Sequence, residues 1–116
     1  MIWRKMERHK IGRMIPPFLM TTIILKVLSE KPMHGYQIAE EISKTLEKEV
    51  PKPAIYFALK KLEKGGFLTF KWEMREKGPA RKTYYITEEG EELLKHKMEL
   101  LKKFYKILGK ILGEVK

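Results

Sequence analysis

Residues 71–82 place cations on both sides of a turn, a pattern suited to binding phosphate groups. Five Lys or Arg residues against two glutamates give the segment a net charge of +3. Gly78-Pro79 predicts a tight turn between them, which would let the chain approach a sugar-phosphate backbone while the cations neutralise phosphates. Lysines protecting an exposed edge strand are the alternative, but that role does not explain cations on both sides of the turn. The five cations are Lys71, Arg75, Lys77, Arg81 and Lys82.

A second cationic surface is predicted on a helix at about 53–64. Tyr56 and Lys60 fall on the face opposite its apolar residues, Lys61 lies beside them, and Lys52 stands just before the helix. A helix with one face in the core and a Tyr/Lys face outward can enter the DNA major groove, which is about 12 Å wide. Taken alone, this helix fits a solvated amphipathic helix equally well.

The sequence disfavours catalysis and metal binding. It contains no Asp and no Cys, which removes many nucleophiles, acid–base pairs and thiolate ligands. The three histidines, His9, His34 and His96, are spread along the chain, unlike the ligands of a zinc site. No P-loop or dinucleotide fingerprint is present. We therefore expect a protein that is not an enzyme and has no metal or other cofactor.

The composition favours a polyanionic partner. Among 116 residues, Lys and Arg outnumber Asp and Glu by 25 to 15, a net charge of +10, which suits DNA, RNA or an acidic membrane surface. All fifteen acids are Glu and Asn is absent, a tendency of hyperthermophile proteins. No apolar run reaches the roughly 18 residues of a membrane span, and no secretory signal is evident. We therefore expect a cytoplasmic protein from a thermophile, with no membrane partner.

Apolar periodicity predicts three helices followed by a hairpin. The first helix covers about 18–29, the second opens at Gly35, and the third is the cationic helix. Aromatic and β-branched residues on both sides of the Gly-Pro turn predict a β-hairpin at about 67–87. Thr87 is expected to cap a last helix that carries glutamates in its first turn.

This order of elements is that of a winged helix-turn-helix domain. We expect an α+β, mostly helical fold in three parts. These are a basic N-terminal arm or helix at 1–15, the DNA-binding winged helix-turn-helix domain at 16–87, and a C-terminal dimerisation helix at 88–116.

Apolar residues of the last helix repeat with alternating spacings of four and three, which is a heptad seam. A neighbouring apolar stripe makes this face wider than a lone surface helix needs. We expect one stripe to pack inward and the other against a second copy of the chain; packing entirely within its own domain is the alternative. A two-fold dimer would set two cationic helices about 34–36 Å apart. The predicted interface residues are Leu94, Met98, Leu101, Tyr105, Leu108 and Leu112.

With these motifs in view, the sequence resembles the PadR family of transcriptional regulators over about 19–95. Four short motifs carry the resemblance. They are Gly35-Tyr36, Tyr56 followed by Leu59, Leu62 and Glu63, the wing motif Gly78-Pro79-x-Arg81-Lys82-x-Tyr84, and Thr87-x-x-Gly90.

The resemblance implies a homodimeric winged-helix regulator of the short-tailed subgroup, usually a repressor, that binds a palindromic operator in double-stranded DNA. Charge alone equally fits a nonspecific nucleic-acid or chromatin protein, and the seam alone fits a protein-interaction module. The candidate DNA-binding residues are Lys52, Tyr56, Lys60, Lys61, Arg75, Lys77, Gly78, Pro79, Arg81 and Lys82.

Some relatives bind phenolic acids or flat hydrophobic drugs near the dimer interface. The resemblance therefore implies that a small hydrophobic or aromatic effector could bind here. Trp3, Trp72, Phe104 and Tyr105 could line its pocket, although purely structural roles for these aromatic residues are the favoured interpretation.

Overall fold

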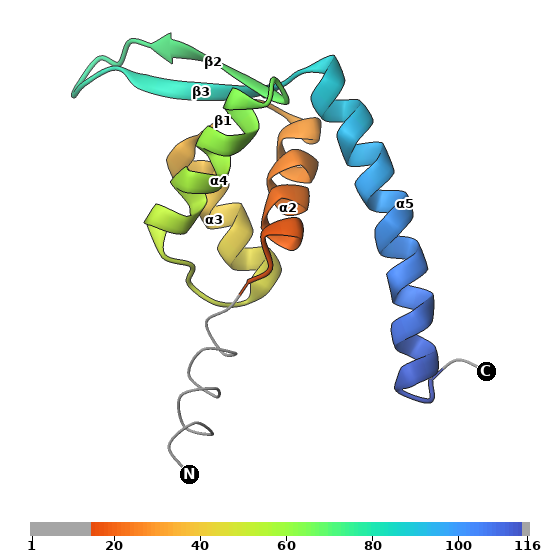
Figure 1. The fold of residues 1–116 in the computed structure, drawn as a ribbon. Helices are drawn as coiled ribbons and strands as arrows, with labels where there is room; N and C mark the ends of the chain where they lie inside the picture. The colour runs from red at the N-terminus through yellow and green to blue at the C-terminus, as the bar shows by residue number, and fades with distance from the viewer. Residues whose placement is uncertain (1–14, 115–116) are drawn as a thin grey trace.

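The computed structural model describes residues 15–114 (Figure 1). The predicted mostly helical α+β winged-helix fold is confirmed. The predicted arm at 1–15, apart from Ile15, lies outside the described residues, and Trp3 lies there with it. The elements in chain order are α2 Pro17–Glu30, β1 Met33–His34, α3 Gly35–Leu46, α4 Lys52–Lys64, β2 Leu68–Glu73, β3 Arg81–Ile86 and α5 Glu88–Ile111.

Helix α2 is the centre of the core and packs against α3, α4 and α5. It begins after Pro16, with Pro17 at its first position, where the missing N–H costs no helical hydrogen bond. Ile24 and Leu25 are completely buried, and the buried Thr22 hydroxyl donates a hydrogen bond to the Phe18 carbonyl at 2.6 Å.

Within residues 15–114, no helix is both long enough and apolar enough to cross a membrane.

Apolar residues form the inner faces of α3 and α4. Ile38 and Ile42 of α3 are completely buried, and so is Leu59 of α4, while Ile55 is 1% exposed. The spacings of three and four residues place these side chains on one face of each helix. The rest of the α4 surface is consequently exposed and carries lysines, Tyr56 and Phe57.

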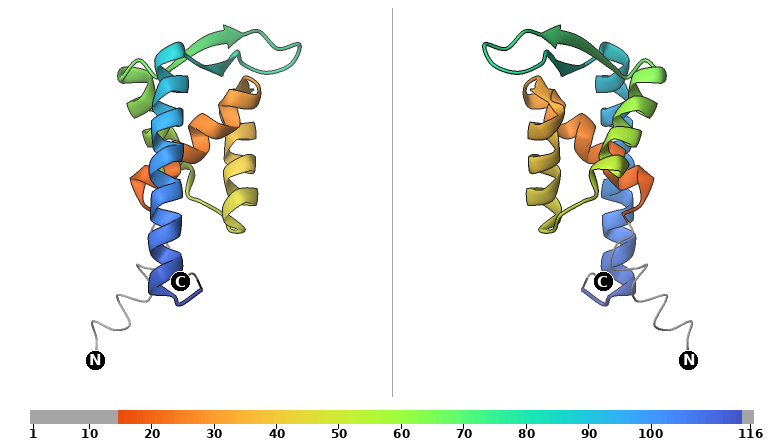
Figure 2. Two further views of the ribbon diagram at one scale, coloured as in Figure 1. Left: turned by 90° about the vertical axis from the view of Figure 1, so that its right-hand side faces the viewer. Right: turned by 90° about the vertical axis from the view of Figure 1, so that its left-hand side faces the viewer.

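Strands β2 and β3 form the predicted hairpin, and β1 adds a third strand in the order β1-β3-β2. The sequence analysis did not predict β1, because two residues are too few to show a period of two. Met33 pairs with Tyr84, which also faces Phe70 on β2. The hairpin is the wing, and Figure 2 shows it extending beyond the helices on one side. Strand β1 ties the base of the wing to the start of α3.

The joint between the wing and α5 explains the Thr87-x-x-Gly90 motif. Thr87 caps α5, because its Oγ1 accepts from the Gly90 N–H at 3.0 Å and donates to the Gly66 carbonyl at 2.7 Å. The Thr87 N–H also donates to the Phe67 carbonyl at 3.2 Å. A Cβ added at Gly90 would collide with that carbonyl oxygen and lie 2.7 Å from Ile86 Cγ1. Only glycine fits here without a shift of the backbone.

We expect Gly90→Ala to lower the free energy of unfolding by about 1–3 kcal/mol, the usual cost of forcing extra atoms into a packed site. Urea denaturation followed by circular dichroism measures the change. Glu91→Ala, at the exposed neighbouring position, is the control and should change stability by less than about 0.5 kcal/mol. Equal stability of the two variants would show that the joint tolerates a methyl group.

Candidate nucleic-acid interface

Helix α4 and the wing together present an exposed cationic surface, hereafter the cationic face. Tyr56 is 49% exposed on α4, and Lys82, the second residue of β3 after the turn of the wing, is half-buried. None of the cations of α4 or the wing forms an ion pair with a carboxylate of residues 15–114. Their positive charge is therefore available to an anionic partner. The exposed cations of this face are Lys52, Lys60, Lys64, Arg75, Lys77 and Arg81. Of the other predicted cations, Lys61 lies beside α2 and α5, where it lines a pocket with Phe18 and Lys97, and Lys71 is exposed on the wing.

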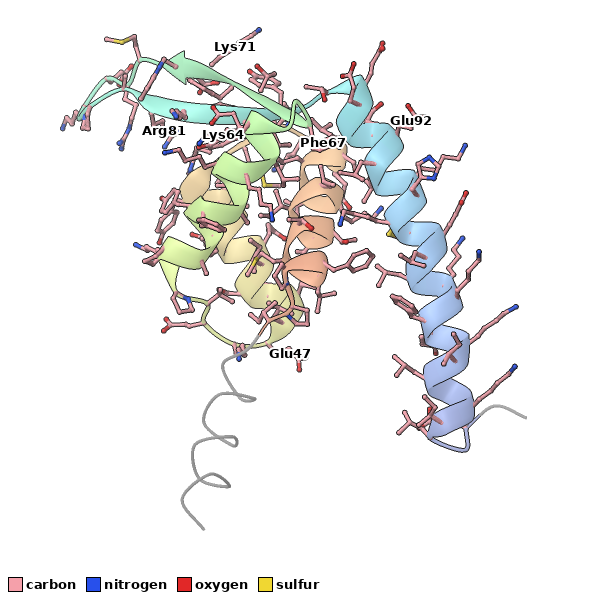
Figure 3. The ribbon with its side chains drawn as sticks, in the orientation of Figure 1. Glu47, Lys64, Phe67, Lys71, Arg81 and Glu92 are labelled. Carbon is pink, nitrogen blue, oxygen red and sulfur yellow. The ribbon has the colours of Figure 1, made fainter. Side chains whose placement is uncertain are left out.

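Aromatic rings support the cations along the strands of the wing. Lys82 Nζ lies 4.1 Å from the ring centre of Phe70 and 5.6 Å from that of Trp72, within cation–π range. Lys71 lies 5.2 Å from the Tyr85 ring centre, and Figure 3 shows it pointing away from the helices. Lys82 therefore contributes to the packing of the wing as well as to its charge.

The turn of the wing is exposed, so another molecule can approach its backbone closely. Gly78 has φ +91°, a conformation that favours glycine, and Pro79 beside it is exposed. A Cβ at Gly78 would lie 3.5 Å from Arg75 Nη1, so the guanidinium folds back over the turn. The predicted Gly-Pro turn thus carries a cation directly above its backbone.

The start of α3 is fixed by a reciprocal capping box. His34 Nδ1 accepts from the Gln37 N–H at 3.3 Å, and Gln37 Oε1 accepts from the His34 N–H at 3.2 Å. Such a pair satisfies two donors of the helix start. It also requires Nδ1 to carry no proton, so the neutral imidazole has its proton on Nε2.

A cleft of about 490 Å³ lies between the start of α3, helix α4 and the wing. We call it the wing cleft. Its lining combines three cations, three tyrosines and a His-Gly pair. These residues are Arg75, Arg81, Lys82, Tyr36, Tyr56, Tyr84, His34 and Gly35.

Gly35 allows Tyr56 to lie close to the start of α3. A Cβ at this position would come within 3.0 Å of Tyr56 Cε1 and 3.3 Å of its hydroxyl oxygen. The glycine of the Gly-Tyr motif thus helps to position Tyr56, which lies on a different helix.

Burial raises the pKa of Tyr84, and the charge of Glu63 raises it further. The Tyr84 hydroxyl therefore stays protonated at neutral pH.

His34 carries a pH dependence. Burial lowers its pKa below the usual 6.5, and the charges of Arg81 and Arg75 lower it further, against smaller opposing effects from Glu73 and Glu40. A depressed pKa means that the unfolded chain takes up the proton first. The stabilisation is therefore complete above about pH 6.5 and is lost as pH falls through the lower pKa of the folded state.

We expect the free energy of unfolding to decrease as pH falls below about 6.5, because protonated His34 no longer caps α3. His34→Asn is the matched variant, since asparagine caps a helix without titrating in this range. Denaturant unfolding at several pH values should show a smaller decrease for this variant than for the wild type. Parallel pH profiles of the two proteins would remove His34 as the cause.

The outer part of α5 exposes a wide apolar stripe. Tyr105 is 77% exposed, Ile111 73% and Leu112 68%, whereas Leu101 is half-buried. Figure 1 shows α5 extending past the end of α2, so α2 does not cover this part. The exposed apolar residues of the stripe are Leu100, Phe104, Tyr105, Ile107, Leu108, Ile111 and Leu112.

The first two predicted interface residues need a correction. Leu94 is 8% exposed within the chain's own core, and Met98 packs partly buried against that core. Near them, Lys97 Nζ donates to Thr21 Oγ1 at 3.1 Å and lies 4.2 Å from the Phe18 ring centre. The inner half of α5 is thus occupied by α2, which leaves only the outer half for another chain.

The structure does not gather the predicted effector residues into one pocket. Trp72 lies on the wing, 63% exposed, whereas Phe104 and Tyr105 lie on the outer half of α5. Phe104 makes an edge contact with Phe18, with ring centres 6.3 Å apart. In the single chain these aromatic residues therefore lie on two different elements, and a shared effector pocket stays a prediction. Among residues 15–114, no group of His or Glu side chains is arranged to hold a metal ion.

Four residues of the wing cleft were missed by the sequence analysis: His34, Gly35, Tyr36 and Tyr84. Gly35, Tyr36 and Tyr84 stood within the family motifs but were given no binding role, and His34 was interpreted as one of three scattered histidines. The missing information was β1, since pairing with β3 brings the start of α3 to the wing. The spacing of apolar residues along a helix does not show which other element its first residues contact.

The fold and the cationic face define a winged helix-turn-helix protein. The chain belongs to the transcriptional regulator PadR-like family, whose sequence model matches residues 24–96. The comparison with curated proteins found no match.

Solved structures of three relatives illustrate the likeness. A protein of Thermoplasma acidophilum described as a transcriptional regulator is 33% identical, with a TM-score of 0.75 over 84% of this chain and 94% of its own. A PadR family regulator of Clostridium difficile is 26% identical, with a TM-score of 0.72 over 81% of this chain and 98% of its own. Bacillus subtilis PadR, in complex with operator DNA, is 28% identical, with a TM-score of 0.60 over 66% of this chain and 44% of its own.

Proposed function

We propose that this PadR-like regulator binds double-stranded DNA sequence-specifically as a homodimer, with α4 in the major groove and the wing against the backbone. The observation that carries the proposal is the cationic face, whose lysines and arginines have no carboxylate partner in residues 15–114. The operator complex of Bacillus subtilis PadR supports it. In this proposal the regulator acts in the cytoplasm.

The residues of the cationic face take different roles in this proposal. Cations near the backbone neutralise phosphates, and each such contact adds to the salt dependence of binding. Lys60, on the exposed face of α4, is the candidate for a base edge, since lysine can donate to guanine O6 and N7. Tyr56 can reach either a base or the backbone. Gly78 and Pro79 let the turn of the wing approach the DNA.

The outer half of α5 is the proposed dimer interface. Its apolar stripe continues beyond the part of the helix that α2 occupies, and a stripe of this kind can pack against its two-fold copy. The two α4 helices of such a dimer would reach half-sites about 34–36 Å apart, which fits a palindromic operator. Binding over a promoter would make the protein a repressor.

A fluorescence-anisotropy titration tests the proposal. The probes are the DNA upstream of the protein's own gene and a shuffled duplex of equal length, each at two salt concentrations. A preference of roughly a thousandfold for the upstream DNA is expected of specific binding. Equal and steeply salt-dependent binding of both duplexes would favour a nonspecific nucleic-acid protein, and no binding at low salt would favour a protein-interaction module.

A further inference from the structure

The wing cleft has the chemistry of an anion site. Its lining residues include three cations and no carboxylate. The guanidinium groups of Arg75 and Arg81 have no ion-pair or hydrogen-bond partner within residues 15–114, and the Tyr56 hydroxyl has no hydrogen-bond partner there. Lys82 is already placed over the Phe70 and Trp72 rings. Two guanidinium groups and one phenolic donor therefore remain unused around the same cavity.

The two arginines make the electrostatic potential inside the cleft more positive. Their charges depress the pKa of His34, whose imidazole also lines the cavity. An anion entering the cleft would thus be attracted by both guanidinium groups, which can each donate two parallel hydrogen bonds to a phosphate. The contact with Gly35 holds the Tyr56 ring at the wall of the cavity. Its hydroxyl can therefore donate to the same anion.

We propose that the wing cleft seats one backbone phosphate of the bound DNA, held by Arg75, Arg81 and the hydroxyl of Tyr56. This inference rests on the proposed DNA-binding function and assigns Tyr56 to the backbone rather than to a base. A phosphodiester is favoured over a free anion because Tyr56 projects from the exposed face of α4, so the cleft adjoins the helix proposed to enter the groove. The seated phosphate joins the wing to α4, and each helps to position the other.

The test compares Tyr56→Phe with the wild type on the upstream and shuffled duplexes. We expect the variant to bind both duplexes at least about tenfold more weakly, because each subunit loses a hydrogen bond to a charged phosphate, with the preference between them unchanged. Tyr85→Phe, on the wing but outside the cleft lining, is the matched control and should bind as the wild type does. A reduced preference in Tyr56→Phe would show base reading and would overturn the inference.

A double-mutant cycle tests whether the two groups share one phosphate. Arg81→Gln and Tyr56→Phe are expected to combine less than additively, because either change disturbs the same contact. Lys77→Gln removes a wing cation outside the cleft lining, and its effect should add to that of Tyr56→Phe. Additive effects in both cycles would overturn the inference while leaving the proposed function intact.

Two further outcomes separate the inference from its alternatives. If the wild type binds neither duplex, the proposed function fails, and the inference fails with it. If inorganic phosphate at constant ionic strength displaces DNA from the wild type but not from Arg81→Gln, free phosphate and DNA compete for the same cleft, which supports the inference.

Discussion

Replacing Arg81 and Lys82 together with alanine is expected to weaken DNA binding at least about a hundredfold at moderate salt. Each lost charge-assisted hydrogen bond costs about 1.5–3 kcal/mol, and each tenfold change in affinity corresponds to about 1.4 kcal/mol. The slope of log affinity against log salt should also become shallower by up to about 3.6, because the proposed dimer loses four cations and each phosphate contact contributes about 0.9. Anisotropy titrations at several salt concentrations measure both quantities.

The control for this variant is Lys106→Ala with Lys110→Ala. These two exposed lysines lie on the outer half of α5, far from the wing in Figure 1, and their removal changes the net charge by the same amount. Because Lys82 also packs on Phe70 and Trp72, the single variant Arg81→Ala separates charge from wing packing. If the wing variant and the control lost equal affinity, the effect would be one of total charge, and the wing would have no special role.

Replacing Leu108 and Leu112 with glutamate is expected to convert the proposed dimer into monomers. Both side chains are more than half exposed, at the end of α5 and directly after it, and in a two-fold seam the four introduced carboxylates would meet one another. Size-exclusion chromatography with light scattering gives the mass directly. Affinity for the upstream DNA should fall by at least a hundredfold, because a monomer contacts only one half-site.

The lysine variant Lys106→Ala with Lys110→Ala serves again as the control, since it changes the net charge by the same two units and leaves the apolar stripe intact. It should remain a dimer. A glutamate variant that still had the mass of a dimer would remove the outer half of α5 from the interface.

The sequence was most informative where a pattern repeats. The inner faces of α3 and α4 follow from apolar spacing, and the Thr87 cap follows from the local chemistry of a helix start. Strand β1 could not be predicted, since its two residues become a strand only by pairing with β3. The wing cleft was missed for the same reason, because it needs that pairing to bring His34 to the arginines.

The heptad seam shows a different limit of sequence analysis. Leu94 and Leu108 occupy equivalent positions of the repeat, yet the first is buried in the core and the second is more than half exposed. Periodicity identifies the apolar face of a helix but not what covers it. Only the length of α2 determines where cover by the same chain ends and an exposed surface begins.

The joint at Gly66, Thr87 and Gly90 would limit the distance between the two DNA half-sites that a dimer can bind. Three hydrogen bonds and the close fit of Gly90 fix the first turn of α5 to the base of the wing. Because no flexible linker separates them, α5 and the wing behave as one rigid unit. A change in the crossing angle between the two α5 helices of a dimer would therefore rotate both wings by the same angle. The permitted distance between half-sites would then be set by the geometry of helix crossing, many residues away from any base contact.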